Sequence, residues 1–514
     1  MKSFKTSVNG LLDNEKASSG ILTAVLIITV LVFNIAVFAI ASIFGLSFTV
    51  NQREELTLSG NTDQLFEAAI RDNKKVTIYF CYPTADELEV HGTGAYVHKT
   101  ALDFKERYGS FINIEYLNLM TRKNSRGEDV SGKIKTWQVN SRDPETVNIL
   151  DKASVVFECG DSYKVVTDVY TSAGFADFYT LDASGQATSY NGEAYMAAMI
   201  NWVTVKEHPV AYFTVGHSEQ FDRAFANILV SAGYYLDTVD LKEEEVPGDA
   251  DLLIISNPLS DFERASEDSR VRTELSRLET YMTHVDSARN LYVALDPYVG
   301  SLPTLEGFLA AYGIKFSESE SGKNPVRNII KDSTNAITVD GFTLVADFAD
   351  NDIANSVAGS VKDHSDGSVI VRQVAALELS KNAVPLLVTT PSAVLEAQGE
   401  RVDSSGSYPV AACVKEAVGG KNVASICVMS GVYASVSDAL VTDKYSNTDF
   451  YYSLFDNFYG QKGMPYGSNV LRWEVTTLEN LTMGRAKLYT AIIMAIPATI
   501  AIVGIVIVYK RKYR

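Results

Sequence analysis

The chain has 514 residues, of which 46% are hydrophobic and 21% are charged. This composition excludes a disordered polyampholyte, a collagen-like repeat and a multi-spanning permease, and at roughly 150 residues per domain the length predicts about three folding units. Asp and Glu total 63 against 45 Lys and Arg, for a formal charge of -18, so the surface as a whole would repel a nucleic acid backbone. Binding to nucleic acid is therefore excluded.

The N-terminal segment carries no charged residue over 17–52 and is almost wholly apolar over 21–48. A hydrocarbon core of about 30 Å requires about 20 helical residues, so we expect a transmembrane helix at 20–48 after a cytoplasmic segment at 1–19. A cleaved signal peptide is the alternative, because lysines precede the apolar run and Ala39-Ile40-Ala41 resembles a cleavage site. The run exceeds the roughly 7 to 15 apolar residues of a typical signal peptide, which favours an uncleaved anchor.

A second uncharged stretch, 488–509, precedes the basic C-terminal end. We expect a transmembrane helix at 487–509, kinked at Pro497, and a basic cytoplasmic tail at 510–514. By the positive-inside rule, the N-terminal lysines and the basic tail both stay in the cytoplasm. The prediction is a two-pass protein of the cell membrane with both termini inside and the bulk of the chain outside.

The region after the first apolar segment mixes helical and strand patterns, so we expect a first extracytoplasmic α/β domain at 56–205. Its strands are short runs of β-branched and aromatic residues, and helical stretches lie between them. The expected helices are 63–70, 97–108 and 193–203, and the expected strands are 75–81, 112–117, 154–158 and 164–167.

The next region shows the clearest alternation of strands and helices, which favours a doubly wound, mostly parallel sheet in a domain at 206–320. The stretch 321–475 alternates short strands with turns and either continues this domain or forms a third α/β domain. Within 206–320 the expected strands are 210–215, 235–241, 252–256 and 290–295, and the expected helices are 220–232, 270–284 and 304–312.

Three loops at the carboxyl ends of these strands form the candidate ligand site, because ligands of doubly wound sheets bind outside that edge. The loops carry Gly216-His217-Ser218-Glu219, Asn257-Pro258 and Asp296-Pro297. We therefore expect the side chains of His217, Ser218, Glu219, Asn257 and Asp296 to face one crevice. The alternative is structural: Ser218 or Glu219 caps the following helix, His217 packs in its loop, and each X-Pro pair ends a strand.

Sequence motifs for catalysis, nucleotide hydrolysis and metal binding are not met. His98 replaces the glycine that a phosphate-binding loop needs before Lys99-Thr100. Ser218 lies where a nucleophile elbow would, yet the residues after it break the G-x-S-x-G pattern. His91, His98 and the acids before them match no metal-ligand spacing. We expect no enzyme, no cofactor and no metal site.

The four cysteines lie far apart in apolar runs, which is typical of small core residues. No C-x-x-C pair occurs, so neither a zinc ribbon nor a dense disulfide framework is indicated. The sequence does not decide whether Cys413 and Cys427, on neighbouring strands, form a disulfide.

Several segments carry a family resemblance in their order along the chain. They resemble the GldG-type auxiliary subunits of ABC transporters, a family first associated with gliding motility. The resemblance implies an extracytoplasmic α/β domain related to one of an intraflagellar transport protein, beside a separate ATPase and permease. The family commonly has glycine where Ser218 stands, and Ser287-Ala288-Arg289 replaces a double glycine. The segments are Leu58-Ser59 through Val76-Thr77-Ile78, Asn191-Gly192-Glu193, Tyr212 to Glu219, Pro247 to Ile254, Leu295-Asp296-Pro297, Tyr312-Gly313-Ile314 and the final apolar run with Pro497.

Three functions are hypotheses at this stage. The first is a non-catalytic auxiliary membrane subunit of an ABC transport system, whose outer region binds a ligand or an envelope protein and whose partners are the permease and the ATP-binding subunit. The second is a cell-surface enzyme that acts on carbohydrate or peptide at the crevice around His217, Glu219 and Asp296. The third is a mechanical envelope adaptor without a small ligand.

Overall fold

The computed structural model divides into two units, Met1–Glu55 and Leu56–Arg514. The second unit is described from residue 58 to residue 472. Short gaps interrupt that range at 91, 140–146, 167–174, 182–184, 265, 269, 271, 285–287, 322–323, 403–404, 419–421, 442–444 and 460–463.

The structure corrects the predicted membrane topology. Within the described residues no helix is both long and apolar enough to cross a bilayer. The longest of them, α5 (Gly92–Tyr108), has 17 residues and carries charged side chains, whereas a span needs about 20 apolar residues. The predicted spans 20–48 and 487–509, like the predicted cytoplasmic ends, lie outside the described residues. The described chain is mixed α/β with several sheets, and the predicted two-pass placement in the cell membrane is not carried further.

The first α/β region is built on a five-stranded sheet in the order β3-β2-β1-β4-β5. β1 pairs in parallel with β2, to which the chain crosses over through α5, and antiparallel with β4, the first strand of the β4-β5 hairpin. Residues of β-branched and aromatic type make β1 almost wholly buried. The strands are β1 (Val76–Phe80), β2 (Ile112–Asn118), β3 (Lys123–Asn124), β4 (Val155–Cys159) and β5 (Ser162–Val166), and the further helices are α3 (Asp63–Arg71), α4 (Ala85–Glu89) and α6 (Ser131–Gln138).

Helix α7 (Gly192–Thr204) links this region to the next. It is predominantly apolar, and every residue except Asn201 is buried. A helix of that kind packs on several sides at once. It contacts β4, β5 and α5 of the first region and α8 (Arg223–Ser231) of the second.

The second region is built on a nine-stranded sheet in the order β17-β16-β19-β22-β23-β11-β10-β8-β9. Pairing is parallel from β9 to β23 and antiparallel from β23 to β17, so the predicted mostly parallel sheet is corrected to a mixed one. The reason is the short connection between β22 and β23, which suits only a hairpin. The strands are β8 (Val210–Val215), β9 (Tyr235–Asp240), β10 (Leu252–Ser256), β11 (Asn290–Ala294), β16 (Thr343–Phe348), β17 (Val369–Arg372), β19 (Val384–Val388), β22 (Pro409–Val418) and β23 (Asn422–Met429).

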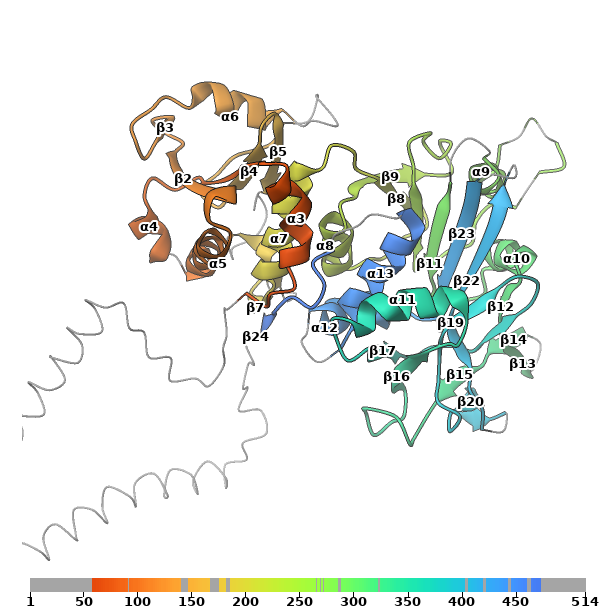
Figure 1. Cartoon of the computed structure of the whole chain (residues 1–514). Helices are drawn as coiled ribbons and strands as arrows, with labels where there is room; N and C mark the ends of the chain where they lie inside the picture. The colour runs from red at the N-terminus through yellow and green to blue at the C-terminus, as the bar shows by residue number, and fades with distance from the viewer. Residues whose placement is uncertain are drawn as a thin grey trace, which may run out of the picture. The chain divides into compact units, whose positions relative to one another are not determined.

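The remaining elements cover this sheet or extend its margins. Helices α11 and α13 contact each other, and α13 also contacts α8 (Figure 1). The helices are α9 (Glu274–Met282), α10 (Pro303–Ala311), α11 (Asp352–Lys362), α12 (Ser437–Leu440) and α13 (Asn447–Tyr459). The short strands are β6 (Tyr179–Leu181), β7 (Ala187–Tyr190), β12 (Ile314–Phe316), β13 (Glu318–Ser321), β14 (Asn324–Arg327), β15 (Ile329–Lys331), β18 (Leu377–Leu379), β20 (Val394–Ala397), β21 (Glu400–Arg401) and β24 (Leu471–Arg472), and the 3-10 turns are η1 (Gly109–Phe111), η2 (Ala176–Phe178) and η3 (Tyr433–Ser435).

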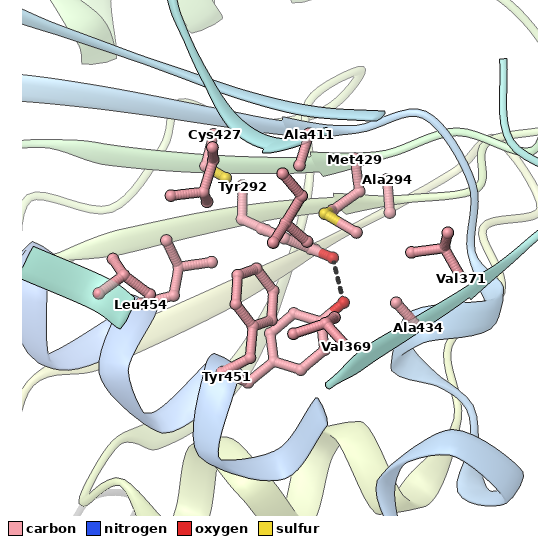
Figure 2. Packing of buried hydrophobic residues seen from close by; sticks show 14 of the residues in the cluster. Tyr292, Ala294, Val369, Val371, Ala411, Cys427, Met429, Ala434, Tyr451 and Leu454 are labelled. Atoms are coloured by element: carbon pink, nitrogen blue, oxygen red, sulfur yellow. Dashed lines mark hydrogen bonds between the residues drawn. The ribbon is translucent and has the colours of Figure 1, made fainter. Parts of the chain in front are cut away.

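The core between this sheet and its helices is largely apolar, and it contains a buried pair of hydroxyl groups. Figure 2 shows Tyr292 of β11 and Tyr451 of α13 pointing toward each other, and their hydroxyl groups form a hydrogen bond of 2.9 Å. Both side chains are fully buried, so the bond satisfies two polar groups that would otherwise be costly to bury. Cys427, in the same view, lies directly opposite Cys413 on β22, and both cysteines are free.

Candidate functional site

The three predicted site loops meet at the carboxyl edge of the parallel strands, because β8, β10 and β11 are in parallel register. The backbone joins them closely. Leu259 N–H donates to the carbonyl of His217 at 2.9 Å, and Asn257 N–H donates to the carbonyl of Ala294 at 2.8 Å. Asp296 N–H donates to Oδ1 of Asn257 at 3.3 Å. His217, Asn257 and Asp296 are therefore brought together as one loop cluster, which we call the carboxyl-edge cluster.

The side chain of His217 makes contacts that the sequence did not reveal. It is only 2% exposed; its Nε2 lies 2.6 Å from Oε1 of Glu274, and its Nδ1 lies 3.1 Å from Oγ of Ser260. The imidazole ring stacks on Phe262 with centroids 4.4 Å apart. The other carboxylate oxygen of Glu274 accepts a hydrogen bond of 2.7 Å from Glu263 N–H. The imidazole is thus fixed on three sides.

Ser218 and Glu219 serve the turn in a different way from the proposed capping. Asp222 is the N-cap of α8, accepting from Ala224 N–H at 2.8 Å, so neither Ser218 nor Glu219 holds that position. Oε2 of Glu219 accepts from His217 N–H at 2.7 Å, and Ser218 is exposed with a φ of 57°. Glycine is needed at Gly216, where φ is 109° and a Cβ atom would lie 2.8 Å from Asp240 Oδ1.

A second site, not predicted from the sequence, is a cavity of about 340 Å³ where α7 meets the second region. We call it the junction cavity; it is lined by parts of α8 and by residues from four segments near 191–194, 364–366, 440–452 and 465–470. Its walls carry hydroxyl, amide and carboxyl groups and the imidazole of His364, and no Lys or Arg occurs among these described lining residues. The polar side chains that line it include Asn227, Ser231, Asp366, Ser446, Asp449 and Tyr452.

Two carboxyl groups give the junction cavity its charge. Asp449, at the start of α13, is 6% exposed, and its Oδ1 accepts from Gly467 N–H at 3.0 Å. Burial raises the pKa of Asp449, against the opposing effects of that hydrogen bond, of Ser365 and of His364. Asp366 is exposed, and hydrogen bonds from Ser368 and Ser446 lower its pKa. Ionisation is therefore favoured for Asp366 at the edge of the cavity, whereas burial disfavours ionisation of Asp449 within it.

The wall of the junction cavity is held by Glu193 of α7. Its Oε1 accepts from both N–H and Oγ of Ser59 at 2.8 Å, and its Oε2 accepts from Asn469 N–H at 3.0 Å. Burial raises the pKa of Glu193, although these hydrogen bonds oppose the shift. A single buried carboxyl group thus fastens the first described residues and the segment 465–470 to α7.

Comparisons with known proteins identify no family for the chain. No family model and no curated protein matches it. Among solved structures, the chain is similar to the N-terminal domain of mmIFT52 at 15% identity and a TM-score of 0.35, over 49% of this chain and 98% of that chain. It is also similar to PurLQS from Thermotoga maritima at 8% identity and a TM-score of 0.26, over 49% of this chain and 99% of that chain. Likenesses this low assign no function, and the GldG-type resemblance stays a prediction.

Proposed function

We propose that the chain is a binding protein that takes a small cationic ligand, an organic amine, in the junction cavity. The observation that carries this proposal is Asp449. Its carboxyl group is nearly fully buried and lines a cavity whose described walls contain no Lys or Arg and a single basic side chain, His364. A buried carboxylate is costly unless a positive group compensates it, and an ammonium group in the cavity supplies that compensation.

The other groups of the cavity fit the same ligand. Ser231, Ser446 and Asn227 offer oxygen atoms to the N–H donors of an ammonium group. Asp366 adds a second negative charge at the edge, where it attracts a cation before binding. Two tyrosines, Tyr445 and Tyr452, also line the cavity, and aromatic faces favour cations.

The size of the cavity limits the ligand. Ligand pockets generally span about 300 to 1,000 Å³, so about 340 Å³ lies at the small end of that range. A polymer cannot be enclosed there, whereas a diamine or a small amino alcohol can. This supports a ligand-binding role over that of an adaptor without a small ligand.

Calorimetry on the full chain tests the proposal. The probe is 1,4-diaminobutane, and 1,4-butanediol, of equal length and no charge, is the matched control. We expect measurable binding of the diamine, none of the diol, and at least a tenfold loss of diamine affinity in Asp449→Asn, because the ion pair is removed. Asp363→Asn, an exposed residue at the end of α11 that does not line the cavity, is the control variant.

Absence of diamine binding, or equal binding by Asp449→Asn and the wild type, would contradict the proposal. The permease and ATP-binding subunit that the family resemblance implies as partners are a separate prediction. Co-purification with the tagged full chain tests it, and recovery of neither partner would remove it.

A further inference from the structure

We propose that Ser260, His217 and Glu274 form an acyl-transfer centre that hydrolyses a carboxylic ester with an apolar acyl group. This goes beyond ligand binding in the junction cavity and departs from the sequence-based expectation of a chain without enzyme activity. The three side chains form a continuous series: Ser260 Oγ lies 3.1 Å from Nδ1 of His217, and Nε2 of His217 lies 2.6 Å from Glu274. A nucleophile, a base and a group that orients the base are the parts that covalent catalysis requires.

The contacts determine which nitrogen acts as the base. An ionised carboxylate only accepts hydrogen bonds, so Nε2 of His217 carries the hydrogen that points to Glu274. In the neutral ring Nδ1 is then the acceptor, and it faces the hydroxyl group of Ser260. Glu263 N–H holds the second oxygen of Glu274, and Phe262 stacks on the imidazole. The base is therefore oriented before any substrate arrives.

The three residues differ in solvent exposure, and the difference fits their separate roles. His217 and Glu274 are 2% and 0% exposed, which removes water from the base and from the group that orients it. Ser260 is exposed, on the loop that follows β10, so a substrate can reach its hydroxyl oxygen. Ser218, which the sequence placed at the turn after β8, is not the residue whose hydroxyl group lies beside Nδ1.

Exposed apolar side chains on the same loops indicate the substrate class. Phe221 follows β8 and is 47% exposed, Leu259 precedes Ser260 and is 48% exposed, and Tyr298 follows β11 and is 60% exposed. Each of the three loops of the carboxyl-edge cluster thus presents one large apolar group to solvent. Leu259, directly before Ser260 in the chain, is the exposed apolar group that lies next to the nucleophile, and it favours an apolar acyl chain in the ester.

The reaction needs water as its only co-reactant. In the first step Ser260 Oγ forms a bond to the ester carbonyl carbon while its proton passes to Nδ1 of His217. The carbon–oxygen bond to the alcohol then breaks, and the alcohol leaves with that proton. In the second step water attacks the acyl-serine, gives a proton to Nδ1, and the acid leaves as the proton returns to Ser260 Oγ. Glu274 is a positioning residue throughout.

The experiment combines covalent labelling with turnover of the full chain. A fluorophosphonate probe is expected to label Ser260, as located by peptide mass, and p-nitrophenyl butyrate is expected to be hydrolysed. Ser260→Ala should abolish both, whereas Ser301→Ala, an exposed serine on the loop after β11, should change neither. Both substitutions are at exposed positions, and unchanged melting temperatures confirm that the variants fold.

Two further variants separate catalysis from support of the fold. His217→Ala should lose at least a hundredfold in turnover, and added imidazole should restore part of it, which a purely structural histidine would not show. Glu274→Gln should lower turnover per fluorophosphonate-titrated site at least tenfold, because that count excludes unfolded molecules. The proposal fails if the wild type is neither labelled at Ser260 nor active on the ester, or if Ser260→Ala retains the activity. It also fails if the binding of 1,4-diaminobutane inhibits as strongly as an ester competitor, since the reaction would then belong to the junction cavity.

Discussion

The carboxyl-edge cluster and the junction cavity each contain a buried carboxyl group, and the two groups differ in how fully the chain pairs them. In the cluster Glu274 is fully buried and is paired with His217 and a backbone N–H group, so its polar requirements are met by the chain itself. In the cavity Asp449 is nearly as buried, but its partners are Gly467 N–H and the hydroxyl group of Ser365, and His364 is the one basic side chain of the described lining. Complete pairing indicates a site that the fold has preorganised, whereas incomplete pairing indicates a site that a ligand completes.

Substitution of Glu274 should have the largest effect on stability. Glu274→Ala leaves His217 and Glu263 N–H without their shared acceptor inside a dry loop cluster. Removal of one member of a buried pair typically costs about 3 to 5 kcal/mol. We expect a loss of that size in the free energy of unfolding, measured by urea denaturation. A loss below about 1 kcal/mol would show that the pair is not buried as described.

Glu193 should come second, since it fastens two distant segments to α7. Glu193→Ala removes the acceptor of Ser59 N–H, Ser59 Oγ and Asn469 N–H. Hydrogen bonds to a charged group contribute about 1.5 to 3 kcal/mol, so we expect a loss of about 2 to 3 kcal/mol. Hydrogen exchange at Asn469 should rise in this variant, because its N–H group loses its acceptor, Oε2 of Glu193. Unchanged exchange at Asn469 in Glu193→Ala would contradict the described contacts.

The sequence predicted the central strands of the second region well, because each is a continuous apolar run with clear ends. The expected strands 210–215 and 252–256 coincide with β8 and β10, where apolar residues run without interruption and turns follow at once. Helix α11 was missed, although Asn351 is its N-cap and Ala354, Val357 and Val361 are spaced to bury one face. That spacing is the signal that could have found it. The antiparallel half of the sheet was missed because strand order across a hairpin is set by tertiary pairing.

For the candidate sites, too, the sequence predicted some residues and missed others. The sequence placed His217, Asn257 and Asp296 at one edge, because consecutive parallel strands have a common direction. It did not reveal Glu274 or Ser260, since their approach to His217 depends on how a long connection folds back. Nor did it reveal the junction cavity, whose residues come from segments as far apart as 191 and 470. The Asn191-Gly192-Glu193 segment indicated only a helix start.

Asp449→Asn should be mildly stabilising, and only at neutral or higher pH. Burial raises the pKa of Asp449 above the unfolded value near 3.8, so its contribution to stability is full below that value and is lost as the pH rises through the raised pKa. The neutral amide avoids this loss, and we expect a gain of about 1 kcal/mol at pH 7 to 8 and none near pH 3. Melting curves of both proteins across that pH range measure it. A gain that is equal at all pH values would contradict the assignment to ionisation.

Ser260→Ala should have the smallest effect on stability, and that contrast sharpens the comparison. Ser260 is exposed and donates to His217 from the outer side, so removal of its hydroxyl group leaves the buried pair of His217 and Glu274 intact. Surface substitutions of this kind usually change the free energy of unfolding by less than about 0.5 kcal/mol. If urea denaturation instead shows a loss comparable to that of Glu274→Ala, Ser260 is part of the support of the loop cluster. A residue that is dispensable for folding but held beside an oriented base is best explained by chemistry at its hydroxyl oxygen.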